Sequence, residues 1–374
     1  ATLADLQTSK PRVDTVVNCA ELANAQFIIK GSGYNPAYGD VTLTNGSVAK
    51  LQVDDFADIR WFGAKNDGVT DCTEIINNAI SLYNLDFKTG NYLVSDTNAS
   101  TTALEADSIS NRALKAANAT IKLADSQNGH IINIKDCSNF TIDGLFFDGN
   151  AVNQTAGHGI RIDNSEGVKI LNTQIKETAG YGIGAQQGTI KNLTIQNVNI
   201  ANTGSDGIDI KNRNDDNLGI LINNVIVDGA GQLQTEQAGI DLRGVCEVNN
   251  VQILNIKNGH SGIRFRGGES GDSSGLGAHY SSLSNFYCEG DNSSLLSNGV
   301  YNDARNVSIS NGSCLEVAVA LQDTINADYG KYSNVQSKSS LARGFWVNSS
   351  NTTVSNCTID GSPEGVRLQG SNNK

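Results

Sequence analysis

One short phrase, a glycine followed by residues that alternate between apolar and polar, returns along the chain. The copies are marked by Gly159, Gly182, Gly207, Gly239, Gly262, Gly299, Gly344 and Gly365. A second short apolar run follows most copies, as at 168–171 and 193–196. The basic step is in the low twenties of residues, and longer steps fit one unit plus an insertion. Such a repeat predicts a solenoid of strands, in which each turn buries its apolar side chains against its neighbours.

Asparagine and glycine occupy the joints between the apolar runs, and both tolerate the left-handed backbone that a sharp corner needs. The chain holds 39 Gly and only 3 Pro, and its aromatic content is low. This composition suits many short strands with tight corners and argues against a helical protein. We therefore predict an all-β fold, a right-handed single-stranded parallel β-helix.

The charge and cysteine content exclude several classes of function. The formal net charge is −12 and no basic run is present, so we expect no nucleic-acid partner. No apolar stretch approaches the length of a membrane span, so we expect no membrane partner. The seven cysteines are scattered and never form a C-x-x-C pair. They predict free thiols buried in the coil, and we expect no metal site and no cofactor.

Two regions are predicted from where the repeat begins. Residues 1–57 lack it and predict a small β-rich head with a connector, and residues 58–374 predict the β-helix. Asp71, with Glu74 three residues later, resembles a helix N-cap and its reciprocal partner. We expect an amphipathic helix over about 72–83 that closes the open end of the β-helix. The sequence is still repeat-like near residue 368, so we expect further C-terminal residues or an end shielded by partners.

The start of the predicted β-helix carries the most specific local motif. The run 62–71, the helix after it and the strand pair at 85–94 resemble the opening of the pectate-lyase-like superfamily, most closely its bacteriophage tailspike version. The resemblance implies a parallel homotrimer attached to the virion tail or baseplate, assembled in the host cytoplasm and acting at the bacterial surface. Its partner would be a capsular or O-antigen polysaccharide. The motif specifies a fold and a capping helix, and the chemistry must come from a site.

The alternation of the repeat also predicts which side chains point outward. With Ile208 and Ile210 inside, Asp209 and Lys211 must point out of the coil. Equivalent positions stack at about 4.8 Å from turn to turn. One predicted column reads Arg161, Gly184, Asp209, Asp241 and Arg264. Its neighbour reads Asp163, Gln186, Lys211, Arg243 and Arg266.

Asp209 and Asp241 are the candidate catalytic pair, because like charges on adjacent turns raise the pKa of one carboxyl group. Hydrolysis of a glycosidic bond needs such an acid and base, and a separation near 5 Å suits a retaining mechanism. Asp206 and Glu236, at the corners before two repeat glycines, are the reserve candidates. We therefore predict a glycoside hydrolase that depolymerises a polysaccharide.

The cations of the same face predict substrate binding, since arginine pairs bidentately with carboxylates and so fits an acidic polysaccharide. Three alternatives stay open: a polysaccharide lyase or epimerase on the same fold, a non-enzymatic glycan-binding adhesin, and ion pairs that only hold the register of the turns. The predicted substrate-binding residues are Arg161, Asp163, Lys211, Arg243, His260, Arg264 and Arg266.

Overall fold

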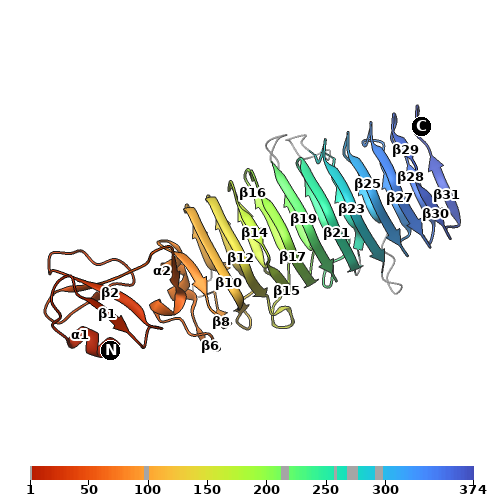
Figure 1. Cartoon of the computed structure of the whole chain (residues 1–374). Helices are drawn as coiled ribbons and strands as arrows, with labels where there is room; N and C mark the ends of the chain where they lie inside the picture. The colour runs from red at the N-terminus through yellow and green to blue at the C-terminus, as the bar shows by residue number, and fades with distance from the viewer. Residues whose placement is uncertain (1, 97–100, 212–218, 257–258, 268–276, 291–297) are drawn as a thin grey trace.

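The computed structural model describes residues 2–96, 101–211, 219–256, 259–267, 277–290 and 298–374. It shows an elongated molecule with a small head at the N-terminal end and a long stack of parallel strands that ends at the C-terminus (Figure 1). The predicted fold class, a parallel β-helix with a capping helix and a β-rich head, is confirmed. Among the described residues, no helix is long and apolar enough to span a membrane.

The head is an antiparallel sheet with its own small core. Helix α1 (Leu3–Thr8) precedes it, and Leu6 of this helix packs with Phe27, Ile29 and Leu51 of the strands. Tyr38 of the head stacks on Phe62 at 5.4 Å between ring centroids. This contact joins the head to the first turn of the β-helix. The strands are β1 (Val16–Cys19), β2 (Ala25–Lys30), β3 (Val41–Thr42) and β4 (Val48–Leu51), in the order β1-β2-β4-β3.

Helix α2 (Thr73–Ile80) closes the N-terminal end of the β-helix core, as predicted, but it is shorter than 72–83. Cys72 is its N-cap and makes no side-chain capping bond, so the N-cap prediction at Asp71 is wrong. Asp71 lies one residue earlier, where its Oδ1 accepts a hydrogen bond from the Thr73 backbone N at 2.8 Å. Ile76, Ala79 and Ile80 are buried against the coil.

Over the described residues, the larger sheet of the β-helix contains sixteen strands and bends at a corner in most turns. The 3₁₀ helix η1 (Ile59–Phe62) lies near its start, and η2 (Ala151–Asn153) follows its strand β12. The strands are β5 (Phe56–Asp58), β6 (Asp67–Asp71), β7 (Asn84–Phe87), β8 (Gly90–Val94), β10 (Ser110–Leu123), β12 (Ser138–Asp148), β14 (Lys169–Leu171), β15 (Gln174–Thr178), β17 (Thr194–Thr203), β19 (Ile220–Asp228), β21 (Cys246–Ile256), β23 (Ser282–Gly290), β25 (Ser308–Leu315), β27 (Lys331–Lys338), β29 (Thr353–Ser355) and β30 (Thr358–Asp360).

The smaller sheet has one strand per turn and carries the recurring phrase. In the part of the chain that the structure describes, its eleven strands run in sequence order, so each turn contacts the next one in the chain. They are β9 (Thr102–Asp107), β11 (His130–Lys135), β13 (Ile160–Asp163), β16 (Ile183–Gln187), β18 (Ile208–Lys211), β20 (Gln237–Arg243), β22 (Gly259–Phe265), β24 (Asn298–Asn302), β26 (Val319–Asp323), β28 (Arg343–Val347) and β31 (Glu364–Leu368).

Two residue types set the geometry of the turns. Corner asparagines of the larger sheet, among them Asn197 and Asn224, have φ near +50° as expected, and their amides form a ladder across the turns. The repeat glycines are required for a different physical reason. A Cβ on Gly182 would lie 2.6 Å from the carbonyl oxygen of Gly207, and a Cβ on Gly207 would lie 2.7 Å from that of Gly239. Close stacking of the turns, and not a left-handed backbone, therefore requires these glycines.

The interior between the sheets is filled by aliphatic side chains that stack in register from turn to turn, for example Ile183, Ile208 and Ile240. All seven cysteines are free, and five of them are buried in the coil as predicted, whereas Cys19 is buried in the head and Cys357 is half-buried. On each strand, the residue between two inward-facing positions must point its side chain outward. The fold therefore fixes a rigid outer face on the smaller sheet.

Candidate functional site

The predicted outward columns follow the observed register of the smaller sheet. Gly184 pairs with Asp209, Asp209 with Asp241, and Asp241 with Arg264. Lys211 pairs with Arg243 in the neighbouring column. Strand β20 thus places an acidic and a basic position directly over those of β18.

One position in the second column departs from the predicted order. A β-bulge between β13 and β16 pairs Asp163 with Gln187, so Gln186 does not continue the column from Asp163. Gln186 instead turns toward Lys211, whose Nζ donates to its Oε1 at 3.0 Å. A bulge re-aims a side chain in this way because the extra residue shifts the alternation.

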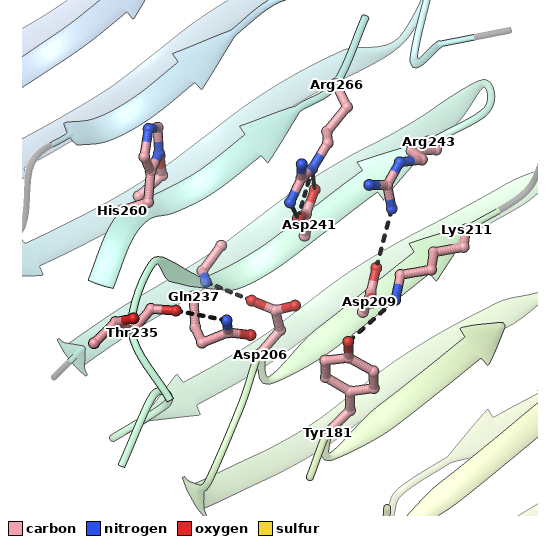
Figure 2. A network of polar contacts seen from close by, with 12 residues as sticks. Tyr181, Asp206, Asp209, Lys211, Thr235, Gln237, Asp241, Arg243, His260 and Arg266 are labelled. Atoms are coloured by element: carbon pink, nitrogen blue, oxygen red, sulfur yellow. Dashed lines mark hydrogen bonds and ion pairs between the residues drawn. The ribbon is translucent and has the colours of Figure 1, made fainter. Parts of the chain in front are cut away.

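Three carboxylates meet at the centre of this face. Asp206, in the corner before β18, joins Asp209 and Asp241, and one oxygen of each lies within 4.8 Å of the others. All three side chains are nearly buried, with exposed fractions of 4%, 1% and 2%. The backbone N of Ala238 donates to Asp206 Oδ1 at 2.5 Å, which fixes this carboxyl group against the next turn. Figure 2 shows the three acids side by side, with His260 set apart from them.

Asp209 is held from one side only. Lys211 Nζ lies 2.9 Å from its Oδ2, and Gln186 Nε2 donates to the same oxygen at 3.2 Å. Its Oδ1 is buried and has no hydrogen-bond partner among the described residues. Arg243 Nη1, the nearest cation on that side, is 3.9 Å away, beyond hydrogen-bond distance. Asp209 therefore keeps one carboxylate oxygen uncommitted.

Asp241 is bound on both oxygens. Arg266 Nε lies 2.9 Å from Oδ1 and 2.8 Å from Oδ2, and its Nη2 donates to Oδ2 at 2.6 Å. A bidentate guanidinium contact stabilises a carboxylate anion more strongly than a single bond does. Asp241 is therefore a fixed negative charge beside the other two acids.

The surroundings shift the pKa values of Asp206 and Asp209 to different extents. Burial raises the pKa of Asp206 well above its ordinary value, and the neighbouring charges of Asp241 and Asp209 raise it further. Burial and Asp241 also raise the pKa of Asp209, while Lys211 works in the opposite direction. Asp206, which makes no ion pair with a cation among the described residues, is accordingly the acid whose neutral form its surroundings favour most strongly.

Lys211 has no free donor. Its ammonium contacts Asp209, Gln186 and the hydroxyl of Tyr181, the last at 3.1 Å. Burial works to lower the pKa of Lys211, but Asp209 and Tyr181 outweigh it, so the pKa lies above its ordinary value. Since an ammonium has three N–H groups, Lys211 is a protonated support for Asp209.

The three acids are also the group that best fits a metal ion, but their neighbours oppose one. Lys211 occupies Asp209 Oδ2, and Arg266 occupies both oxygens of Asp241. A divalent cation would have to displace both cations. The donor set therefore matches an acid–base site better than a metal site.

The remaining predicted residues lie around this centre. Glu236 is exposed at a corner with φ +59° and lies outside the carboxylate cluster. His260 packs edge-on against Tyr301, its Nδ1 lies 2.6 Å from Ser261 Oγ, and burial lowers its pKa to about 4. The guanidinium of Arg264 lies over the ring of Tyr301. Of the two reserve carboxylates, the structure thus brings only Asp206 to the centre.

Tyr181 and the Gln186 contact were missed by the sequence reasoning. Tyr181 precedes Gly182 as Asp206 precedes Gly207, so it occupies the equivalent corner one turn earlier. Aligning the residues before each repeat glycine would have revealed this corner column. The role of Gln186 depends on the bulge, for which the sequence offers no signal that we recognise.

No family model and no curated protein matches the sequence. Solved structures are similar to it over most of its length. The enzymatically active domain of tailspike protein 2 from bacteriophage CBA120 matches with a TM-score of 0.57 and 13% identity, over 96% of this chain and 52% of that one. The tailspike of Acinetobacter baumannii phage AM24 matches with 0.57 and 14%, over 99% and 65%. The A-module of the Azotobacter vinelandii mannuronan C-5 epimerase AlgE4 matches with 0.54 and 17%, over 86% and 99%.

At sequence identities this low, the structural similarity shows a shared fold and nothing more. The chain therefore has the parallel β-helix architecture of phage tailspikes and of a mannuronan epimerase, as its opening motif predicted. Since this fold carries more than one chemistry, the activity must be argued from the carboxylate cluster.

Proposed function

We propose that the chain is the β-helical part of a phage tailspike that binds and depolymerises a bacterial surface polysaccharide, capsule or O-antigen, by endo-glycosidic hydrolysis. One observation carries the proposal: Asp206, Asp209 and Asp241 share one point of the rigid face but have three different environments. Glycoside hydrolysis requires one carboxyl group that keeps its proton and a second that is charged.

The environments suggest a role for each acid. Asp206, with its raised pKa, is the general acid that protonates the oxygen of the leaving sugar. Asp209 has an uncommitted Oδ1 and is the nucleophile or general base. Asp241, bound on both oxygens by Arg266, is the fixed charge that keeps the proton on Asp206.

The separation of the carboxylates bears on stereochemistry. Retaining glycosidases have carboxyl groups about 5–5.5 Å apart, whereas inverting enzymes leave about 6.5–9.5 Å for a water molecule. Each acid has an oxygen within 4.8 Å of an oxygen of the other two, which leaves little room for a water molecule between them and favours direct attack by Asp209 and a covalent intermediate.

β-Elimination is the runner-up, and the contacts of Lys211 weigh against it. A lyase needs an unprotonated base to remove a proton beside a uronate carboxyl group. Lys211 has all three N–H groups engaged and a raised pKa, so it is a poor base. The neutral His260 is the remaining basic candidate, and a binding-only adhesin is the alternative without chemistry.

Digestion of a panel of purified capsular and O-antigen polysaccharides tests the proposal. We expect new reducing ends without the ultraviolet absorbance of a new double bond. Reducing ends with that absorbance would establish a lyase. Binding without any cleavage across the panel would establish an adhesin.

The assembly and location are proposed with the same function. The tailspike likeness supports a parallel homotrimer on the virion tail or baseplate, assembled in the host cytoplasm and acting at the bacterial surface. Light scattering after size-exclusion chromatography would test the trimer, and a monomeric mass would contradict it.

A further inference from the structure

A second polar cluster lies on the same face, two and three turns before Asp209. It comprises His130 and Asn133 of β11, and Arg161 and Asp163 of β13. Asn133 pairs in register with Arg161, and the same column continues through Gly184 to Asp209. Two turns at about 4.8 Å each place Arg161 roughly 10 Å from Asp209 along the axis.

The His130 ring is approached by more N–H groups than it can accept. The backbone N of His158 lies 3.0 Å from its Nδ1, and Arg161 Nη1 lies 3.2 Å from its Nε2. Burial, and the neighbouring charge of Arg161, lower the pKa of His130 to about 4, so the ring is neutral near pH 7. A neutral imidazole has a single acceptor nitrogen. One of the two contacts is therefore a meeting of two N–H groups, whichever tautomer is present.

The tautomer follows from which donor has an alternative. The backbone N–H of His158 has only this recorded acceptor, and a buried backbone donor is rarely left unpaired. Nδ1 is then the acceptor and Nε2 carries the hydrogen. Nε2–H of His130 and an N–H of Arg161 consequently converge, and one oxygen acceptor placed within hydrogen-bond distance of both nitrogens would satisfy both.

The same cluster has acceptors without donors. Asp163 Oδ1 and Asn133 Oδ1 are buried and have no hydrogen-bond partner among the described residues. The second oxygen of Asp163 accepts from Arg161 Nε at 2.7 Å. Arg161 and Asp163 balance each other's charge, so the cluster has no net charge to attract an anion.

Unsatisfied donors and unsatisfied acceptors together identify the chemistry of the missing partner. A carboxylate offers only acceptors and would be repelled by Asp163. A sugar hydroxyl donates one hydrogen bond and accepts two, so a pair of hydroxyl groups meets both needs. We propose that His130, Asn133, Arg161 and Asp163 form a subsite that binds an uncharged sugar residue through its hydroxyl groups, two to three turns from the catalytic acids. This inference rests on the proposed glycan-directed function and deepens it.

Rings lead from this subsite to the catalytic centre. His158 stacks on His130 at 4.3 Å and Tyr181 stacks on His158 at 4.5 Å. The backbone N of Tyr181 donates to His158 Nδ1 at 3.0 Å, which repeats the His158–His130 contact one turn later. The hydroxyl of Tyr181 then contacts Lys211, the support of Asp209. A glycan bound at the subsite would therefore extend along one rigid column toward the scissile bond.

The test measures binding apart from cleavage. The full chain with Asp209→Asn is titrated with each polysaccharide of the panel, with and without a second substitution at the subsite. Arg161→Ala is expected to weaken binding about ten- to a hundredfold, the effect of a lost charge-assisted hydrogen bond. Gln322→Ala, in the same column on the other side of Asp241, is the matched control and should change affinity less than about twofold.

The sign of the effect at Asp163 distinguishes the ligand classes. Asp163→Asn should weaken the binding of a hydroxyl-bearing sugar severalfold, because a charged acceptor becomes neutral. Tighter binding would mean that the subsite takes an anionic sugar and would overturn the assignment. Unchanged binding by both Arg161→Ala and Asp163→Asn would leave only a structural role, such as enclosing a buried water molecule.

Two further comparisons separate the possible failures. The double variant Arg161→Ala/Asp163→Asn keeps the local charge balanced, so a thermal melt distinguishes a folding defect from a lost contact. No binding to any polysaccharide by the Asp209→Asn chain would overturn both the proposed function and the subsite. Binding that is retained in full by the subsite variants overturns the subsite alone.

Discussion

The two sheets of the β-helix share one coil and one core, but their outer surfaces obey different rules. On the larger sheet, corner amides satisfy each other: Asn224 Nδ2 donates to Asn197 Oδ1, and Asn250 Nδ2 donates to Asn224 Oδ1. On the smaller sheet, buried charges lie close together and Asp209 Oδ1 has no hydrogen-bond partner in the described part of the chain. A surface that satisfies its own polar groups holds the fold together. One that leaves them unmet at a rigid position is suited to bind a ligand.

The largest effect is expected on catalysis. Asp206→Asn removes the proposed acid and Asp209→Asn the proposed nucleophile, and each should lower the rate of reducing-end release about 10²–10⁴-fold. Asp148→Asn, on the larger sheet, is the matched control and should leave the rate within about twofold, because its partner Lys176 is largely exposed. Equal losses of the cleavage rate in all three variants would contradict the conclusion that only the smaller sheet carries the catalytic site.

The next effect is on stability. Arg266→Ala leaves Asp241 buried without its cation, which should cost about 3–5 kcal/mol in the free energy of unfolding. Lys176→Ala breaks an exposed pair with Asp148 and should cost about 0–1 kcal/mol. Denaturant unfolding measures both. Restored stability in Arg266→Ala/Asp241→Asn would identify the buried charge as the cause.

A pH series should show the raised pKa of Asp206 directly. Because the folded state binds this proton more tightly than the unfolded chain, its stabilising contribution is complete below the ordinary pKa of 3.8 and is lost as the pH rises through the raised value. The unfolding free energy of the native chain should therefore fall relative to that of Asp206→Asn as the pH rises from about 4. Cleavage should fall over the same range, since the acid loses its proton. A difference that stays flat with pH would contradict the assignment of the acid.

The smallest effect is expected in the amide ladder. Asn224→Ala removes two ladder bonds and places alanine at φ +53°, which should cost about 1–2 kcal/mol. Asn224→Gly loses the same bonds without the backbone strain and should cost less. Neither change should alter cleavage. A loss of cleavage here would show that the larger sheet shapes the site as well.

Much of the smaller sheet was predictable because strands obey a period of two. Once Ile208 and Ile210 face inward, Asp209 must face outward, and the next copy of the phrase places Asp241 beside it. The helix boundaries at α2 were less predictable, since Asp71 accepts a hydrogen bond from the backbone N of Thr73, the first helical residue, from one position before the N-cap. The sequence also overestimated how much positive charge this face offers to a substrate. Lys211 and Arg266 are engaged by Asp209 and Asp241, so less positive charge is available for an acidic polysaccharide than the sequence suggested.

The sequence by itself determined the coil, its inward residues and the order of the first outward column, because these follow from local alternation repeated at a constant step. Only the tertiary structure decided which members of the columns act together. The corner before β18 brings Asp206 to Asp209, and the bulge between β13 and β16 leaves Gln186 directed at Lys211. The stacking of turns also sets two N–H groups against each other at His130. These contacts join residues from different turns, and their geometry depends on corner conformations that no periodic pattern encodes.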